Sequence, residues 1–208
     1  MQWIDIQQNT PEWEELRVGR VGGSSIAKVM ANYGKAFGKP AQELAERIAL
    51  EQLQGKAVGS NYTNEHMQRG HAEEPIARDL YEKETFSEVT NGGYYIESED
   101  VGVSPDGLVD NDGMIEIKCV IYSVHFQTKR REAYDPKYKW QLALNLSASG
   151  REWIDYVEFC SEFPKGNRLF VQRLTRADIG QMADKIRHRL SQFKVLVEQN
   201  KKIAIGQA

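Results

Sequence analysis

The sequence has few cysteines and no long apolar run, and these absences exclude several classes of protein. Its two cysteines, Cys119 and Cys160, lie in apolar, strand-like stretches, so we expect reduced core thiols of a cytoplasmic protein rather than a disulfide or a metal site. The four histidines show no zinc-site spacing. No apolar run could span a bilayer, and the N-terminus lacks a basic stretch followed by an apolar one, so we expect neither a membrane protein nor a secreted one.

Repeats, low-complexity stretches and linkers are also absent from the 208 residues. Hydrophobic residues make up 40% of the chain, enough for one good core, so we expect a single domain over residues 1–208. The only glycine-rich tract, residues 19–38, lacks the Gly-Lys-Ser/Thr ending of a nucleotide-binding P-loop. It can instead open a helix capped by Ser24 or Ser25, whose backbone N–H groups would face a phosphate.

The net charge of −3 is unusual for a protein that binds DNA, but the charges are unevenly distributed. Between residues 118 and 139, six basic residues outnumber two acidic ones, a local excess of four positive charges. The members of this basic segment are Lys118, Lys129, Arg130, Arg131, Lys137 and Lys139. Such an excess suits a phosphate backbone, and the alternative for residues 129–131 is a solvated helix face.

The spacing of apolar residues predicts helices and strands in alternation, and therefore an α/β fold. One helix opens at Pro40 and stops at Gly55, and a longer one runs from about Asn64 to Glu84 with a kink or break near residue 71, since Pro75 lies inside it. Further along, the sequence predicts a helix start at Asp135-Pro136, strands at 152–159 and 169–175, and a capping box from Thr175 to Asp178. The helix after this box carries an apolar stripe that we expect to be core or a subunit contact: Ile179, Met182, Ile186, Leu190, Phe193 and Val197.

The stretch from residue 102 to residue 120 carries the most informative pattern. Asp-Asn-Asp-Gly at 110–113 predicts a hairpin turn, and residues 114–120 predict the returning strand. Because side chains alternate along a strand, Glu116 and Lys118 share one face, beside Asp106 if the other face packs on a helix layer. Two carboxylates and the main-chain carbonyl of Ile117 are hard oxygen ligands of the kind that Mg²⁺ takes, and Lys118 could orient or deprotonate a water or neutralise developing charge. The pattern indicates a metal-dependent phosphodiesterase site, although a turn aspartate beside a solvated Glu–Lys pair would look the same.

Three other segments accompany this motif in a fixed order. They read Arg17-Val-Gly-Arg-Val-Gly-Gly-Ser24-Ser25, then Arg69-Gly-His-Ala-Glu73-Glu74-Pro75-Ile-Ala-Arg78, and, downstream of the motif, Tyr138-Lys-Trp-Gln141. In this order and spacing, from about Trp13 to about Phe159, the chain resembles the YqaJ-like viral recombinases, the phage lambda-type exonuclease family of the PD-(D/E)xK nuclease superfamily. The resemblance implies a restriction-endonuclease-like core, with a mixed sheet flanked by helices.

The same resemblance assigns roles to individual residues. The catalytic group is Asp106, Glu116, Lys118 and Gln141, and the metal ligands are Asp106, Glu116, Ile117 through its carbonyl, and Glu74. The implied cofactor is Mg²⁺, as two ions, with Mn²⁺ as a substitute. The residues for DNA and its terminal 5′-phosphate are Arg17, Ser24, Ser25, Lys129, Arg130, Arg131, Lys137 and Lys139. Helical phase leaves Glu73 as a rival to Glu74, because Glu73 lies nearer the centre of a buried face made of Ile76, Ala77, Leu80 and Tyr81.

The function implied by the family is a Mg²⁺-dependent exonuclease that degrades one strand of linear double-stranded DNA from 5′ to 3′. It would leave a 3′ single-stranded overhang for recombination by strand annealing. The family also implies a ring-shaped homotrimer, a partner single-strand annealing protein, and a phage or prophage protein in the cytoplasm of a bacterial host. Two alternatives stay open: a structure-specific or restriction-like endonuclease that uses the same site, and a non-catalytic DNA-binding module of the same fold.

Overall fold

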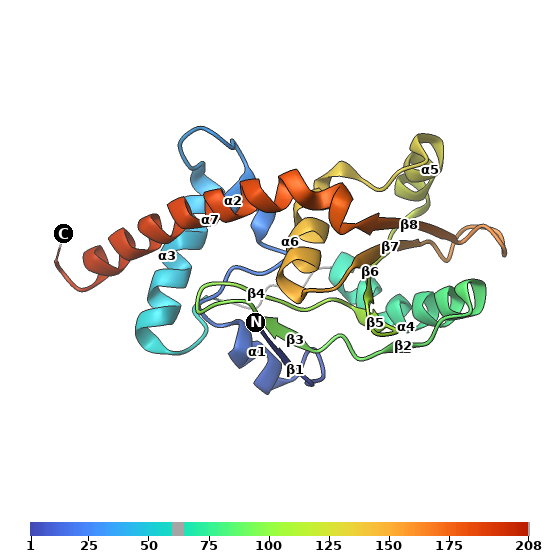
Figure 1. The fold of residues 1–208 in the computed structure, drawn as a ribbon, viewed down its shortest axis with the longest axis horizontal. Coiled ribbons are helices and arrows are strands. Elements are labelled where there is room, and N and C mark those ends of the chain that lie inside the picture. Colours follow the sequence, from blue (N-terminus) through green and yellow to red (C-terminus); the bar gives the residue numbers. More distant parts are fainter. Residues whose placement is uncertain (60–64, 208) are drawn as a thin grey trace.

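A mixed five-stranded sheet forms the centre of the computed structural model, which describes residues 1–59 and 65–207 (Figure 1). The strand order is β2 (Val89–Thr90), β5 (Gly107–Val109), β6 (Gly113–Cys119), β7 (Trp153–Phe159) and β8 (Leu169–Thr175). Strands β6 and β7 are parallel, whereas the neighbouring pairs are antiparallel. The predicted α/β class with a mixed sheet is therefore confirmed, and β6 lies in the middle of the sheet rather than at an edge.

A smaller antiparallel sheet and two short helices make up the N-terminal part. The sheet consists of β1 (Gln2–Ile4), β3 (Tyr94–Ile96) and β4 (Gly102–Val103), and the helices are α1 (Pro11–Arg17) and α2 (Ile26–Met30). A single bridge between Val21 and Val101 joins the segment before α2 to the segment before β4. These contacts bring the glycine-rich tract towards the chain that leads into the catalytic motif.

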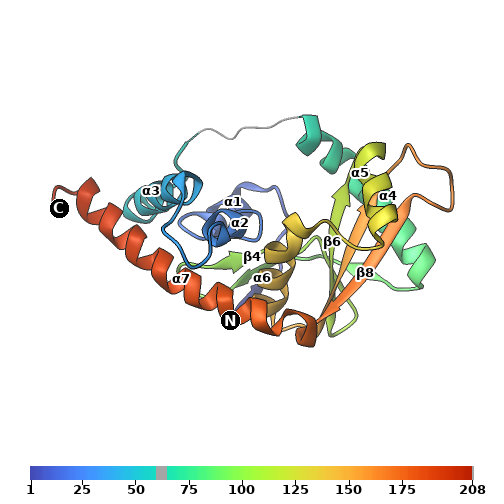
Figure 2. The ribbon, with the colours of Figure 1, turned by 90° about the horizontal axis from the view of Figure 1, so that it is seen from above.

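Helices cover both faces of the large sheet. Helix α4 (Glu65–Thr85) packs on one face, where its Ala77 and Tyr81 join Ile115 and Ile117 of β6 in one apolar cluster. Helix α6 (Lys139–Ser149) packs on the other face, with Met114 of β6 (Figure 2). Alternate residues of β6 therefore lie on opposite faces, as the sequence predicts.

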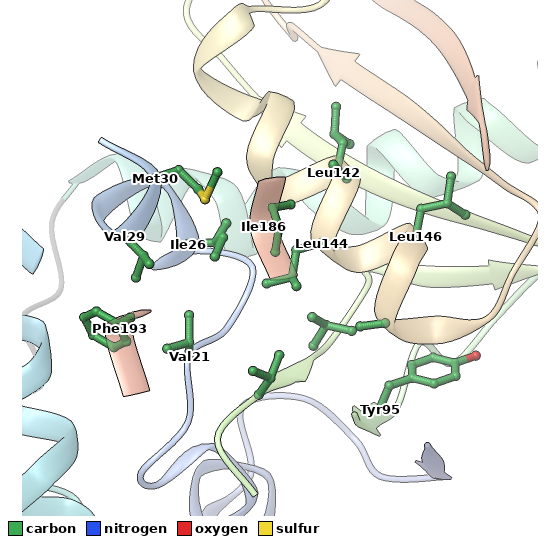
Figure 3. Packing of buried hydrophobic residues seen from close by; sticks show 14 of the residues in the cluster. Val21, Ile26, Val29, Met30, Tyr95, Leu142, Leu144, Leu146, Ile186 and Phe193 are labelled. Atoms are coloured by element: carbon green, nitrogen blue, oxygen red, sulfur yellow. The ribbon is translucent and has the colours of Figure 1, made fainter. Parts of the chain in front are cut away.

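The C-terminal helix α7 (Arg176–Ala204) crosses the molecule from the end of β8 to helix α3 (Lys39–Gln54) (Figure 1). The predicted capping box is present, since Thr175 and Asp178 exchange both of its hydrogen bonds. Ile186 and Phe193 of the predicted stripe pack against Val29 and Met30 of α2 (Figure 3). Within the chain, this stripe is therefore part of the core, which is one of the two roles that the sequence predicts for it.

Three expectations about local structure need correction. Helix α4 runs continuously from Glu65 with Pro75 inside it, so of the predicted kink or break near residue 71 the break is absent; its predicted start at Asn64 lies outside the described residues. Ile76 is 52% exposed rather than buried, because Ala77 and Tyr81 define the packed face. Between the predicted start at residue 135 and helix α6 there is a separate 3₁₀ turn, η1 (Pro136–Tyr138), whose N-cap is the predicted aspartate.

The remaining helix is α5 (Tyr122–Arg131), which follows β6 closely. Cys119 and Cys160 are both free thiols, although Cys119 is only partly buried. Burial, followed by the charge on Glu73, raises the pKa of the Cys119 thiol to about 12. Among the helices of the described ranges, none combines the length and the apolar character that a membrane crossing requires.

Candidate active site

Glu116 is the centre of a hydrogen-bonded cluster on β6. Its side chain is 2% exposed, and both carboxylate oxygens accept hydrogen bonds. Lys118 and Gln141 donate to Oε1, and Asn145 donates to Oε2 at 2.7 Å. Residues 116 and 118 share a face because the strand alternates, and residues 141 and 145 share a face because they are one helical turn apart.

Asp106 lies beside this cluster because its backbone and side chain both bond to β6. Its N–H donates to the carbonyl of Ile115 at 3.1 Å, and its Oδ2 accepts from the N–H of Ile117 at 2.6 Å. The last residue of β6 paired with β5 is Ile115, so Ile117 lies beyond the end of that ladder. The N–H and C=O of one strand residue point to the same side, so the carbonyl of Ile117 is directed towards Asp106.

Helix α4 supplies a third carboxylate, and it comes from Glu74. Burial, and then the charge on Asp106, raises the pKa of Glu74 to about 7, while Arg78 at 3.5 Å opposes the shift. Glu73 points elsewhere, because the hydroxyl of Ser161 donates to its Oε1 at 2.6 Å. The structure thus places Glu74 with the other carboxylates and Glu73 against the loop after β7.

A polar groove of about 490 Å³ opens next to these carboxylates. Its lining consists of Glu74, Arg78 and Asp106 together with the amide residues Gln7, Gln8, Asn9 and Asn91. Solvent and a polar substrate can therefore reach the two acidic residues directly.

The charges of the cluster act strongly on one another. Burial, and then the charge on Asp106, raises the pKa of Glu116 to about 7, and Glu74 adds to the effect. Burial also raises the pKa of Asp106, against the opposing effect of Lys118. For Lys118 itself, burial acts to lower the pKa, but Glu116 and Asp106 raise it on balance. Lys118 is therefore a protonated ammonium beside carboxylates that repel one another.

Carboxylate and carbonyl oxygens of this kind fit Mg²⁺, a hard cation that would relieve the mutual repulsion. In the part of the chain that the structure describes, no three His, Cys, Asp or Glu side chains form a ready-made metal cluster. Both oxygens of Glu116 are turned to the ammonium and amide donors around it. These oxygens would have to coordinate the ion as well as accept those hydrogen bonds.

Arg17 reaches the motif through an aromatic side chain. Its guanidinium lies 4.1 Å from the ring centroid of Trp13, whose indole N–H donates to Ser104 at 3.0 Å, two residues before Asp106. The guanidinium also pairs with Glu14 at 3.2 Å. Since an arginine has five N–H donors, that pair leaves others available.

The two serines of the glycine-rich tract differ in their surroundings. Ser24 is exposed, whereas the Ser25 hydroxyl bonds to the backbone of Gly22. The expected side-chain cap is absent: α2 begins after Ser25 without a capping bond from it. Gly23 lies against helix α6, where an added Cβ would come within 2.6 Å of the Asn145 oxygen and 3.2 Å of Gln141. The tract therefore touches the cluster that holds Glu116.

Several residues of the basic segment already make contacts within the chain. Lys129 donates to the carbonyl of Leu169 at 2.7 Å, Arg131 to that of Ala133 at 3.1 Å, and Lys137 pairs with Asp135 at 3.0 Å. Lys139 lies over the ring of Trp140, with its ammonium 4.9 Å from the centroid. Arg130 is exposed and lies near an aromatic ring of its own helix.

The sequence interpretation did not assign two residues that contact the site. Asn145 is 1% exposed, bonds Glu116 through Nδ2, and has an Oδ1 without a hydrogen-bond partner. Arg78 pairs with Glu74 and donates to the carbonyl of Asp106 at 2.5 Å. Both follow an assigned residue by four positions on a helix, a spacing that puts side chains on one face and could have identified them.

A family model, the YqaJ-like viral recombinase domain, matches residues 12–152. The chain belongs to this family. No curated protein matches it. It is 30% identical to an alkaline exonuclease from Laribacter hongkongensis, with a TM-score of 0.79, over 96% of this chain and 100% of that one.

A second structure of the Laribacter exonuclease, in complex with dAMP, matches the YqaJ-like chain with a TM-score of 0.80. A phage-related exonuclease from Haemophilus somnus is 18% identical, with a TM-score of 0.67 over 89% of this chain and 96% of that one. At that identity the likeness concerns the fold alone. Together these neighbours show that the chain has the PD-(D/E)xK nuclease fold.

Proposed function

We propose that this chain, as a single domain, is a Mg²⁺-dependent exonuclease that degrades one strand of linear double-stranded DNA from 5′ to 3′. The product would be a 3′ single-stranded overhang used for recombination by strand annealing. The observation that carries the proposal is the convergence of Asp106, Glu116 and Glu74 with Lys118 beside a polar groove. Membership of the family and the 30% identity to an alkaline exonuclease support it.

Asp106, Glu116, Glu74 and the carbonyl of Ile117 would hold two Mg²⁺ ions, for which Mn²⁺ could substitute. A bound ion would lower the pKa of the attacking water and offset the charge of the phosphate. The donor chemistry fits this cofactor, because carboxylate and carbonyl oxygens are the ligands that Mg²⁺ prefers.

The polar side chains around Glu116 have a positioning role in this proposal. Gln141 and Asn145 hold its carboxylate in one orientation from the adjacent helix. Lys118 would stabilise the negative charge that develops on the phosphate oxygens, as a fixed ammonium does in a site shielded from water. Its raised pKa argues against a role as the base that deprotonates water.

End recognition would use Arg17, Ser24 and Ser25 as a pocket for the terminal 5′-phosphate. Their connection to the site supports this, since Arg17 reaches Ser104 through Trp13 and Gly23 lies against Gln141. The exposed Arg130 and the other residues of the basic segment would contact the DNA backbone. The dAMP bound to the Laribacter enzyme agrees with stepwise cleavage, which releases nucleoside monophosphates.

The proposal has three further parts. The chain would form a ring-shaped homotrimer around DNA with free ends, and it would work with a partner single-strand annealing protein. It would act in the cytoplasm of a phage-carrying bacterium. These rest on family membership.

The decisive experiment uses purified protein, Mg²⁺, and a linear duplex labelled at each end in turn, with a covalently closed circular duplex as a control. We expect progressive loss of the 5′-labelled strand, an intact 3′ overhang and an uncut circle. Cutting of the circle would instead show an endonuclease. Binding of DNA without any cleavage would show a non-catalytic module.

A further inference from the structure

Helix α5 exposes its two aromatic residues and buries two of its polar ones. Tyr122 is 55% exposed and Phe126 is 48% exposed, whereas His125 and Thr128 have no exposed surface. A surface helix normally shows the opposite arrangement, with an apolar face towards the core. Positions that break this rule are expected where function, rather than stability, selects the residue.

The buried face of α5 is anchored by hydrogen bonds to Glu158 of β7. The Glu158 carboxylate lies 2.9 Å from His125 Nδ1 and accepts hydrogen bonds from the Thr128 hydroxyl at 3.0 Å and the Tyr156 hydroxyl at 2.7 Å. His125 Nε2 lies 3.1 Å from the carbonyl of Asn167. The anchor fixes α5 on the sheet and leaves its aromatic face outward.

The exposed face is both aromatic and positively charged. Tyr122, Phe126 and Arg130 follow one another at intervals of four residues and so form one stripe along the helix. The Arg130 guanidinium lies 5.7 Å from the ring centroid of Phe126. The ring centroids of Phe126 and Phe163 are 4.7 Å apart. The whole helix has three basic residues and no acidic one.

The position of α5 connects this stripe to the candidate active site. The helix begins at residue 122, three positions after the last residue of the strand that carries Glu116 and Lys118. In Figure 2, α5 lies beside the C-terminal end of β6, on the same side of the molecule as the beginning of α4. A DNA strand that leaves the carboxylates at this end of the sheet would pass over α5.

We propose that Tyr122, Phe126 and Arg130 form a stacking platform for single-stranded DNA, namely the strand that remains after its complement has been cleaved. This inference rests on the proposed exonuclease function. Every base has an aromatic face, so stacking on Tyr122 and Phe126 accepts any sequence, and Arg130 adds its charge to phosphate and its plane to a base. The positive charge of the helix favours DNA over a protein partner.

The test measures the affinity of the protein for fluorescein-labelled oligothymidylate in EDTA, where no cleavage occurs, by fluorescence anisotropy. We expect Tyr122→Ala and Phe126→Ala each to weaken binding by about 5-fold to 100-fold, the range of one lost base–aromatic stack. Phe126→Trp should retain wild-type affinity, since its ring also stacks. The matched control is Phe86→Ala. Phe86 is an aromatic residue that follows α4 and is 96% exposed, and this variant should bind the oligonucleotide as the wild type does.

Two further measurements separate this inference from the proposed function. Asp106→Ala should still bind the oligonucleotide while it fails to cleave a duplex. A wild type without nuclease activity would remove the exonuclease proposal, yet the loss of binding in Phe126→Ala would still support the platform. Unchanged oligonucleotide binding in Phe126→Ala would overturn the platform. So would a smaller particle mass for that variant in sedimentation, because the stripe would then be a contact between copies of this chain.

Discussion

Two buried glutamates on neighbouring strands of the same sheet have different surroundings. Glu116 and Glu158 are 2% and 0% exposed, and each has three polar side chains at hydrogen-bond distance. The carboxylates of Asp106 and Glu74 lie near enough to Glu116 to raise its pKa, and both line an open groove, whereas the partners of Glu158 are His125, Thr128 and Tyr156. The comparison teaches that burial with satisfied hydrogen bonds does not identify a site, whereas carboxylates gathered beside an opening do.

The largest expected effect concerns the Glu116 side of this comparison. Asp106→Ala, Glu116→Ala and Lys118→Ala should each reduce the cleavage rate of a linear duplex at least ~10²-fold, the scale of one lost electrostatic element. Each variant should stay folded, which circular dichroism checks. Normal cleavage by any of them would remove that residue from the site.

Deletion of the other glutamate should affect stability first. Glu158→Ala leaves the buried hydrogen-bonding groups of His125, Thr128 and Tyr156 without their partner, so we expect a loss of roughly 3–5 kcal/mol of unfolding free energy. Urea denaturation measures this loss. A variant as stable as the wild type would show that the anchor of α5 contributes nothing to stability.

The two glutamates of helix α4 sharpen the comparison further. Glu74→Gln should reduce Mg²⁺-dependent cleavage by about tenfold to 100-fold, because it removes one carboxylate from the group that a metal neutralises. Glu73→Gln is the matched control, since Glu73 accepts from Ser161 instead, and it should cleave at nearly the wild-type rate. If the control were the inactive variant, the role would move to Glu73.

The pH dependence of stability should distinguish the clustered carboxylates from ordinary ones. The pKa values of Glu74 and Glu116 are raised from 4.5 to about 7, so the folded state binds more protons than the unfolded state between these values. Stability without metal should therefore fall as the pH rises through this interval.

At pH 8, Mg²⁺ should reverse this loss. An ion at ten times its dissociation constant adds about 1.4 kcal/mol, visible as an increase in Tm of a few degrees. Glu116→Gln should show a smaller increase. An equal increase in the variant would place the ion away from Glu116.

The smallest expected effect concerns end selection. A 5′-phosphorylated duplex should be digested faster than a 5′-hydroxyl duplex, and Arg17→Ala should shrink this preference by about fivefold to tenfold, since arginine binds a phosphate through paired N–H groups. Single-turnover rates on the two duplexes give the ratio. The same ratio in variant and wild type would leave Arg17 as the surface partner of Glu14.

The sequence predicts those parts of the fold that depend on neighbours in the chain. The turn at residues 110–112, the alternation of β6 and the cap at Thr175 all follow from local rules, and the structure agrees. Local rules do not predict which face of α4 is buried. Ile76 is exposed and Ala77 is buried because of what packs against each of them in the folded chain. Polar contacts from distant elements were also beyond prediction, as the pairing of His125 with Glu158 across 33 residues shows.

The charge pattern shows the same limit. The sequence has basic residues shortly after the motif, but it cannot show that Lys129 donates to a carbonyl of β8 while Arg130 is exposed. Both residues carry the same charge on neighbouring positions of one helix, so only the packed structure separates them.

The close approach of Gly23 to helix α6 has a consequence for the length of each catalytic step. With no side chain between them, the backbone that leads to Ser24 lies directly on Gln141 and Asn145, which hold Glu116. If Ser24 receives the terminal phosphate, this close contact fixes the distance between that phosphate and the bond that is cut. A methyl group at position 23 would push the backbone away from helix α6 and lengthen that distance. The size of the released fragment would then change.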